Sequence, residues 1–218
     1  MSWSSGKDST YALAAARRDP DLDVVGLLVT MNFDADRVSM HAVRRELVVA
    51  QAERLGLPLH LVDLPSPCPK ELYEEAMRRA VADARADDVE AMVFGDLYLA
   101  DVRAYREQAF EGTGVTPRFP LWKLPTAQLA RDMLAAGVRA VVTSVDPAQA
   151  PTEIAGRQWD ERLLVELPAG VDPCGEGGEF HTFFWDGPGF REPIAVETGE
   201  IVERDGFVFC DVLPRVRH

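Results

Sequence analysis

Short apolar runs alternate with helical patterns along the first half of the chain. Residues 24–29, 57–64 and 91–94 are mostly apolar over the length of a buried strand. Residues 41–55 and 70–86 instead carry apolar side chains three and four positions apart, which is the spacing of an amphipathic helix. Strands that alternate with helices predict an α/β fold, in which a parallel sheet has helices on both faces.

The second half of the chain has a different pattern, because Pro and Gly become frequent there. Residues 126–136 still predict a helix, and residues 138–144 predict a strand. Loops and short strands are expected further on, with a hairpin turn at Asp205-Gly206. We therefore expect two domains, a larger one at residues 1–114 and a smaller α+β domain at residues 115–218.

A small polar loop precedes the first predicted helix, residues 10–18. Its sequence is Ser-Ser-Gly-Lys-Asp-Ser, at residues 4–9. Small residues let the backbone approach a ligand closely, and a helix N-terminus points unpaired N–H groups at anions. Lys7 adds a positive charge. This arrangement suits a polyphosphate, although a surface turn or a helix cap is the alternative for so short a motif.

Polar residues also follow two of the predicted strands. Gly95 and Asp96 come directly after residues 91–94, and Asn32 comes soon after residues 24–29. Ligands of open parallel sheets bind at the carboxyl ends of the strands, so these residues and the loop are expected to share one crevice. Contact with a metal or the substrate is the preferred role of Asp96, and capping of the next helix is a close second.

A second unusual stretch lies at residues 172–182, where glycines are interleaved with carboxylates and a His follows. Glycines let a loop fold tightly and present Glu176 and Glu179 to a ligand. These carboxylates suit the binding of Mg²⁺, the orientation of an amine or the work of a general base. A glycine-rich turn with solvated carboxylates is the alternative. His181 fits a proton shuttle or a hydrogen-bonded structural role.

Composition narrows the range of partners and compartments. The chain has 218 residues, 47% of them hydrophobic, and a formal net charge of −13, which argues against a large nucleic-acid footprint. No apolar run has the length of a membrane span. The three cysteines form neither a zinc motif nor a Cys-x-x-Cys pair, so a reduced cytoplasmic setting is expected.

Five motifs occur in a fixed order along nearly the whole chain. They are the Ser-Ser-Gly-Lys-Asp-Ser start, Phe94-Gly95-Asp96, Pro120-Leu121-Trp122, Gly156-Arg157 and residues 175–182 (Gly-Glu-Gly-Gly-Glu-Phe-His-Thr). The start resembles the PP-loop of ATP pyrophosphatases, with Ser5 in place of the first Gly of Ser-Gly-Gly-x-Asp-Ser. The set as a whole resembles the diphthine–ammonia ligase family of N-type ATP pyrophosphatases. Residues 175–182 are its most specific part.

The resemblance implies a Rossmann-like (HUP-type) ATP-binding domain and a smaller C-terminal domain that helps to bind the substrate. It also implies an ATP-dependent amidation, in which a carboxylate is adenylated, pyrophosphate leaves and ammonia displaces AMP. The implied catalytic residues are Lys7, Asp96, Glu176 and Glu179. ATP binding is assigned to Ser4, Ser5, Gly6, Lys7, Asp8, Ser9, Asn32 and Gly95. Substrate binding is assigned to Arg103, Arg157, Gly177, Gly178, His181 and Thr182. Asp8 is also the candidate ligand of Mg²⁺.

The acceptor depends on the source of the chain. The family's substrate is the diphthine residue of elongation factor 2, which belongs to archaea and eukaryotes, whereas the Ala- and Arg-rich usage resembles the family's bacterial branch, for which the acceptor is unknown. Free ammonia is the expected nitrogen donor, because no glutaminase-like Cys–His pattern is present. A homodimer is one option for the assembly. A nucleotide-binding regulator without turnover, and an adenylating enzyme for another small-molecule or RNA acceptor, are the alternative functions.

Overall fold

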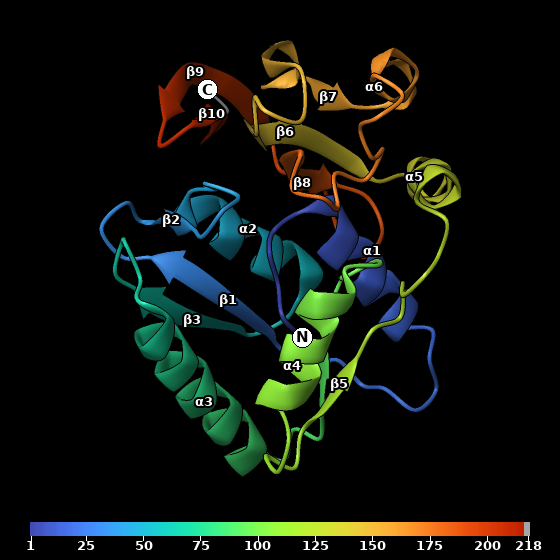
Figure 1. The fold of residues 1–218 in the computed structure, drawn as a ribbon. Coiled ribbons are helices and arrows are strands. Elements are labelled where there is room, and N and C mark those ends of the chain that lie inside the picture. Colours follow the sequence, from blue (N-terminus) through green and yellow to red (C-terminus); the bar gives the residue numbers. More distant parts are fainter. Residues whose placement is uncertain (216–218) are drawn as a thin grey trace.

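The first half of the chain forms a parallel α/β layer, as the sequence predicts (Figure 1). The computed structural model describes residues 1–215. Strands β1 (Leu27–Asn32) and β3 (Leu59–Leu64) pair in parallel over their whole length, and β2 (Arg37–Val38) adds an antiparallel edge. Strands β4 (Ala91–Val93) and β5 (Thr116–Arg118) form a second, short parallel pair.

Four helices accompany these strands: α1 (Lys7–Ala16), α2 (Arg45–Leu55), α3 (Lys70–Ala86) and α4 (Ala100–Ala109). Three of them lie where a helix was predicted, although α1 begins three residues earlier than expected, and α4 had not been predicted. Helix α2 begins four residues later than predicted, because Met40 and Ala42 have left-handed φ angles of 65° and 55°. It ends as expected at Gly56, whose φ of 67° caps the helix.

The second half contains a mostly antiparallel sheet, more regular than the predicted loops and short strands. Strand β6 (Arg139–Val145) lies at its centre and pairs with β7 (Gln158–Trp159), β8 (Phe180–Asp186) and β10 (Phe207–Pro214). Strand β9 (Val196–Arg204) pairs with β10. Helices α5 (Thr126–Ala135) and α6 (Glu161–Glu166) and the 3₁₀ turn Thr152–Ile154 flank it. The predicted hairpin is confirmed, because Asp205 and Gly206 join β9 to β10 with φ angles of 54° and 81°.

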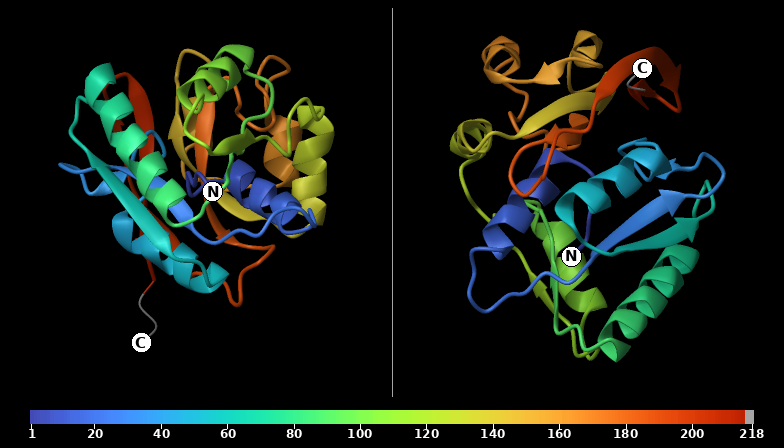
Figure 2. Two further views of the ribbon diagram at one scale, coloured as in Figure 1. Left: turned by 90° about the horizontal axis from the view of Figure 1, so that it is seen from below. Right: turned by 180° about the vertical axis from the view of Figure 1, so that it is seen from behind.

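The two halves pack against each other along α1 and α2. These helices lie between the parallel sheet and the antiparallel sheet, while α3 covers the opposite side of β1 and β3 (Figures 1 and 2). One buried apolar cluster contains residues of both halves, including Leu13 of α1 and Phe184 of β8. At the edge of this interface, Asp211 of β10 accepts hydrogen bonds from Arg37 at 2.7 Å and from Arg44 at 2.6 Å.

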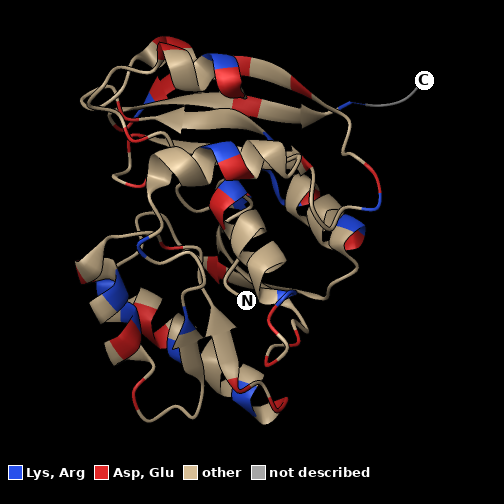
Figure 3. Cartoon of the chain, turned by 90° about the vertical axis from the view of Figure 1, so that its right-hand side faces the viewer, with Lys and Arg blue, Asp and Glu red and all other residues tan. Residues whose placement is uncertain are grey.

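Charged residues are distributed over both halves. Figure 3 shows acidic and basic positions interspersed along the helices. Within residues 1–215, the helices are too short or too polar to cross a membrane.

The side chain of Gln51 connects helix α2 with residues 3–5 and with strand β8 in the interior. Its Oε1 accepts a hydrogen bond from the Trp3 indole at 2.9 Å, and its Nε2 donates to the carbonyls of Ser5 at 3.0 Å and Phe184 at 2.6 Å. Gln51 is fully buried. Removal of its amide would therefore leave the Trp3 indole N–H without a partner and take one hydrogen bond from each of two carbonyl groups, of which that of Ser5 still accepts from the Phe184 backbone at 2.9 Å.

We expect Gln51→Met to lower the free energy of unfolding by roughly 3 kcal/mol, since each unpaired buried group costs on the order of 1–3 kcal/mol. Chemical denaturation measures this change. Gln108→Met, at an exposed position of α4, is the control and should stay within about 0.5 kcal/mol of the parent protein. Equal effects of the two substitutions would contradict the role given to Gln51.

Candidate active site

The polar loop at residues 4–9 leads into the start of a helix. Helix α1 begins at Lys7, and its N-cap residue Gly6 has no side chain that could accept a hydrogen bond from the first turn. The first-turn N–H groups of a helix have no partner inside the helix; in α1 that of Lys7 donates to Thr182 Oγ1 at 3.3 Å, so those of Asp8 and Ser9 are the candidates for binding an anion. Gly6 has no room for a side chain, because a Cβ there would lie 2.9 Å from the His41 ring and 3.1 Å from the Thr182 carbonyl oxygen.

Lys7 points its ammonium group into the interior between the two halves. Its Nζ donates hydrogen bonds to Asp8 Oδ2 at 2.8 Å and to the carbonyl oxygen of Cys174. The rings of Trp159 and Phe180 lie 5.4 Å and 5.5 Å from the nitrogen. Burial lowers the pKa of Lys7, but Asp8, with smaller contributions from Cys174 and Glu176, more than offsets this effect, so the net pKa is raised and the ammonium stays charged.

The glycine-rich acidic loop lies directly against this ammonium group. Gly175 has a φ of 68°, and a Cβ there would lie 2.6 Å from the Phe180 carbonyl oxygen. Glu179 closes the loop, since its Oε1 accepts a hydrogen bond from the Asp172 backbone at 3.0 Å. Thr182, at the end of the loop, lies within 3.3 Å of the Lys7 backbone nitrogen through its Oγ1. The two loops singled out in the sequence therefore form one structure.

Glu176 connects the acidic loop to the segment between β4 and α4. Its Oε1 accepts hydrogen bonds from the backbone N–H of Leu97 at 2.7 Å and of Tyr98 at 3.3 Å. Burial raises the pKa of Glu176 to about 7, and the two N–H groups limit that rise. A carboxyl group with a pKa near 7 is suited to accept and release a proton near neutral pH.

Asp96 lies at the carboxyl end of β4 and forms an ion pair with Arg106 of α4. Their side chains approach to 2.9 Å, and the Arg106 guanidinium also stacks over the Phe94 ring, at 4.3 Å from its centroid. These contacts fix the side chain of Asp96, for which metal or substrate contact stays a prediction.

Two histidines line the other side of the crevice. The rings of His41 and His181 have centroids 4.6 Å apart, and His41 Nδ1 lies 3.0 Å from the Thr182 carbonyl oxygen. Burial lowers the pKa of His41 to about 4, and it also lowers that of His181 well below its usual value. Both rings are therefore neutral at pH 7. Cys174 is buried as well, and burial raises the pKa of its thiol, so it is unsuited to act as a nucleophile.

These elements enclose a pocket of about 230 Å³. Its lining includes nine of the residues selected from the sequence: Ser4, Lys7, Asp8, Ser9, Gly95, Asp96, Glu176, His181 and Thr182. Gly95 must lack a side chain, because a Cβ there would lie 3.0 Å from the Ser9 backbone nitrogen. The loop, Gly95 and Asp96 thus line one pocket, as expected for a crevice at the strand ends, whereas Asn32 is not part of its lining.

Other selected residues are not part of the pocket lining. Ser5, Gly6, Gly177, Gly178 and Glu179 belong to the two loops that shape it. Asn32 accepts a hydrogen bond from the Ala35 backbone at 3.1 Å. Arg103 stacks over the rings of Phe119 and Trp122, and Arg157 pairs with Glu166 at 2.7 Å. The ligand contacts assigned to Asn32, Arg103 and Arg157 stay predictions.

Comparison with known proteins identifies the family. The family model of the diphthamide synthase N-terminal domain matches residues 1–117, and that of the C-terminal domain matches residues 125–214. This chain belongs to the diphthamide synthase family.

Individual relatives agree with the assignment to the diphthamide synthase family. The chain is similar to proteins named diphthine–ammonia ligase from Homo sapiens and Rattus norvegicus, with 27% and 25% identity over 96% of this chain and 86% of theirs. A protein of the same name from Danio rerio is 27% identical over 82% of this chain and 76% of its own length.

Two residues of the pocket lining, His41 and Arg106, and the supporting residue Gln51 were not among those selected from the sequence. None of the three lies in a motif. Their partners lie far away in the chain or on a loop that has no regular pattern. The close contact between Gly6 and the His41 ring could not be inferred from the sequence.

Ser5 stands where the resembling motif has Gly, and its backbone shows why Gly fits there. Its φ is 67°, and its buried Oγ has no hydrogen-bond partner within residues 1–215. We expect Ser5→Gly to stabilise the fold by about 1 kcal/mol, because Gly adopts this conformation without strain. This corresponds to a rise in Tm of roughly 2–4 °C.

Ser9→Gly, inside α1, gives a control of opposite sign, since Gly in a helix interior costs about 1 kcal/mol. Thermal unfolding of both variants tests the assignment. A lower Tm for Ser5→Gly would show that the left-handed backbone is not strained by the serine.

The raised pKa of Glu176 predicts a pH-dependent stability. The folded state holds this proton up to about pH 7, whereas the ordinary pKa of a Glu side chain is 4.5, so stability falls as pH rises between these values and is constant above them. Glu176→Gln removes this loss. Between pH 4.5 and 7, the free energy of unfolding of the variant should therefore rise by roughly 2 kcal/mol relative to that of the parent protein. This amount allows for partial solvent screening of the carboxyl group.

Denaturation at several pH values measures this difference, with Glu203→Gln at an exposed position of β9 as the baseline. If the difference in unfolding free energy between Glu176→Gln and the parent protein does not change with pH, the pKa of Glu176 is not raised in the folded protein.

Proposed function

We propose that this protein is an ATP-dependent ligase that converts a carboxylate into an amide. A carboxylate oxygen of the acceptor attacks the α-phosphorus of ATP, and pyrophosphate leaves. The nitrogen of ammonia then attacks the acyl carbon, AMP leaves, and one proton passes to a base. The observation that supports the proposal is the contact of the α1 loop with residues 175–182, which brings Lys7 and Glu176 to one pocket.

The ATP end of the site is formed by the loop at residues 4–9. The first-turn N–H groups of α1 and the hydroxyls of Ser4 and Ser9 are donors for phosphate oxygens. Lys7 supplies the positive charge that stabilises the leaving pyrophosphate. A Rossmann-like fold of the HUP type for residues 1–114, with a substrate domain at residues 115–218, belongs to the same proposal.

Mg²⁺ fits this site as a companion of ATP. Proteins hold Mg²⁺ through one or two carboxylates together with substrate phosphates, so a dedicated cluster of ligands is not required. Asp8 is the carboxylate that would hold it, because its Oδ1 is buried without a partner within residues 1–215. When bound, Mg²⁺ would offset negative charge on the phosphates.

Glu176 is the residue best placed to handle the proton of the nitrogen donor. Its carboxyl group faces the pocket, and its pKa of about 7 lets it accept a proton at neutral pH. Glu179 holds the loop in shape, and Asp96 with Arg106 defines the opposite wall. Catalysis then depends on positioning and charge stabilisation.

The acceptor is proposed from the names of the relatives, which point to diphthine and ammonia. The acceptor carboxylate enters next to residues 175–182. Diphthine is the proposed acceptor if the organism of origin makes diphthine. If it does not, the proposed acceptor is another molecule with a carboxylate.

We expect Lys7→Met to abolish the formation of AMP and pyrophosphate from ATP, ammonia and acceptor, because the charge on the leaving group is no longer offset. Product analysis by chromatography measures the loss. Lys70→Met, at an exposed position of α3, is the matched control and should keep full activity.

Removal of Lys7 alone leaves the buried Asp8 carboxylate unpaired, so the fold needs an independent check. The double variant Lys7→Met with Asp8→Asn removes both charges, and its Tm shows whether inactivity reflects unfolding. Formation of ADP and phosphate would contradict the proposed reaction. Tight ATP binding without AMP formation would favour a regulator, and co-purified RNA would favour an RNA acceptor.

A further inference from the structure

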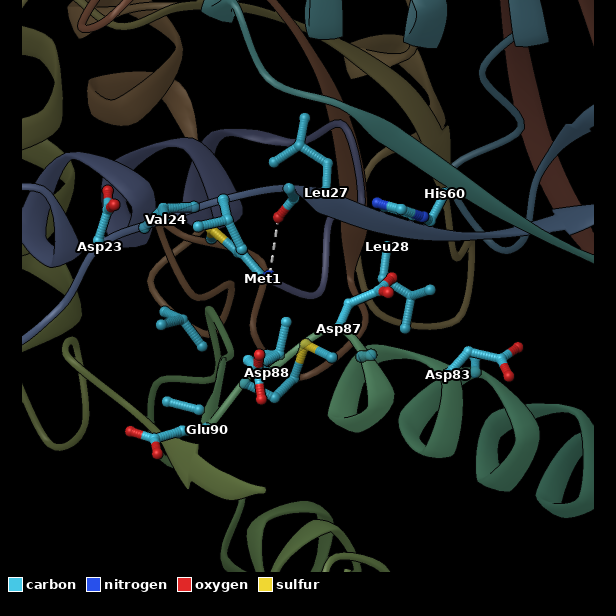
Figure 4. A pocket seen from close by; sticks show the side chains of 18 of the residues that line it. Met1, Asp23, Val24, Leu27, Leu28, His60, Asp83, Asp87, Asp88 and Glu90 are labelled. Carbon is cyan, nitrogen blue, oxygen red and sulfur yellow. Dashed lines mark hydrogen bonds between the residues drawn. The ribbon is translucent and has the colours of Figure 1, made fainter. Parts of the chain in front are cut away.

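The largest cavity of the protein lies away from the two loops of the candidate active site. Its volume is about 920 Å³, and it opens at the amino ends of β1 and β4, where Figure 4 shows His60 together with a group of acidic side chains. Within residues 1–215, its lining includes none of the residues selected from the sequence. His60 is thus a histidine outside the active site, and it offers a control for the two histidines inside it.

His41 and His181 line the smaller pocket and carry ring nitrogens that are not used within the protein. His41 Nδ1 lies 3.0 Å from the Thr182 carbonyl oxygen. A carbonyl oxygen only accepts, so Nδ1 carries the ring hydrogen and Nε2 of the neutral ring is an acceptor. Within residues 1–215, His41 Nε2 has no hydrogen-bond partner, and neither ring nitrogen of His181 has one. One nitrogen of the neutral His181 ring is also an acceptor.

The backbone around His41 adopts a conformation that is unusual for residues other than glycine. Met40 and Ala42, on either side of it, have φ angles of 65° and 55°. Residues in such conformations cluster at functional sites, because the surrounding structure has to hold them there. The Cε1 atom of the ring faces Gly6, since a Cβ on Gly6 would lie 2.9 Å from it. Cε1 is bonded to Nε2, so the unpaired acceptor lies beside the loop at residues 4–9.

Glu176 supplies a third acceptor in the same pocket. Its Oε1 is used by the backbone N–H groups of Leu97 and Tyr98, at 2.7 Å and 3.3 Å, whereas Oε2 has no partner within residues 1–215. In its ionised form the carboxyl group only accepts hydrogen bonds. His41, His181 and Glu176 thus bring three unpaired acceptors to a pocket of about 230 Å³.

Three acceptors in one pocket match the chemistry of ammonia. Ammonia has three N–H groups to donate and keeps its lone pair free for attack. Water has two O–H groups and would leave one acceptor without a donor, and a buried polar group without a partner costs free energy. A site built to pair the N–H groups of its substrate discriminates against molecules that lack one of them.

We propose that His41, His181 and Glu176 form the binding site for the ammonia of the amidation, each accepting one of its N–H groups. The histidines hold and orient the nucleophile. When the nitrogen attacks the acyl carbon and the bond to AMP breaks, one proton of the nitrogen passes to the Glu176 carboxylate. The identity of the ligand rests on the proposed ligase function. The site also gives the enzyme a means to prefer ammonia over water, which would hydrolyse the acyl-adenylate.

Nitrogen-15 NMR of the histidine rings tests binding without the acceptor. The full chain is titrated with ammonium chloride at mildly alkaline pH, where part of the ammonium is present as ammonia. We expect the ring-nitrogen resonances of His41 and His181 to shift to saturation, while those of His60 stay unchanged. Sodium chloride at the same concentrations controls for ionic strength. The proposal is wrong if the shifts are absent, or if sodium chloride produces the same shifts.

Substitutions of the two histidines test the same site in the amidation of the diphthine acceptor. His181→Phe removes both ring nitrogens and keeps a ring of similar shape. We expect it to raise the KM for ammonia about tenfold and to leave the KM for ATP within about twofold, because one hydrogen bond to ammonia is lost. His60→Phe is the matched control and should leave both KM values unchanged.

Two substitutions at His41 separate its acceptor from its structural hydrogen bond. His41→Asn keeps a donor for the Thr182 carbonyl oxygen but has no acceptor at the position of Nε2, so it should raise the KM for ammonia as His181→Phe does. His41→Gln places its amide near the position of Nε2 and should recover part of the loss. Equal KM values for ammonia in His41→Asn, His181→Phe and the parent protein would overturn the proposal.

The readouts distinguish failure of the ammonia site from failure of the ligase function. Formation of AMP by the parent protein at saturating ammonia reports the ligase reaction. The ring-nitrogen shifts and the KM for ammonia report the site. If the parent protein forms no AMP, the ligase function fails, and the titration with ammonium chloride still decides whether His41 and His181 bind ammonia.

Discussion

The buried ammonium group of Lys7 is the constraint on which the site depends. Its partners come from both halves of the chain, with the Asp8 carboxylate on its own helix and the Cys174 carbonyl oxygen on the acidic loop. A buried charge that loses its partner costs on the order of 3–5 kcal/mol. Helix α1 and residues 175–182 therefore form one unit, and the position of either loop fixes the other.

The elements with strong periodic patterns could be predicted from the sequence. The predicted helix at residues 70–86 matches α3, and the strand predicted at 138–144 is observed one residue later as β6. A long amphipathic helix and a continuous apolar strand each repeat their signal over many residues, so local pattern suffices. The hairpin at Asp205-Gly206 was predictable for another reason, because both residues tolerate the left-handed backbone that the turn requires.

The rest depended on contacts between distant positions. The motifs identified the two loops, yet nothing in them indicated that Lys7 would donate a hydrogen bond to a carbonyl group 167 positions away. The start of α2 was placed too early, because the apolar spacing carries no information on the left-handed residues Met40 and Ala42. Gln51 joins Trp3, Ser5 and Phe184, and a lone Gln on a helix gives no local signal for such a role.

The charges of the pocket also constrain how it receives a polyanion. Both cations of its lining are already paired, Lys7 with Asp8 and Arg106 with Asp96, and Glu176 adds a further carboxyl group. Phosphates that enter this site meet an environment with no surplus positive charge from side chains. The remaining favourable terms are the N–H groups at the start of α1 and any cation that accompanies the nucleotide. In the function proposed above, the unpartnered Oδ1 of Asp8 would bind such a cation, and this would let an acidic protein hold phosphates with few basic residues.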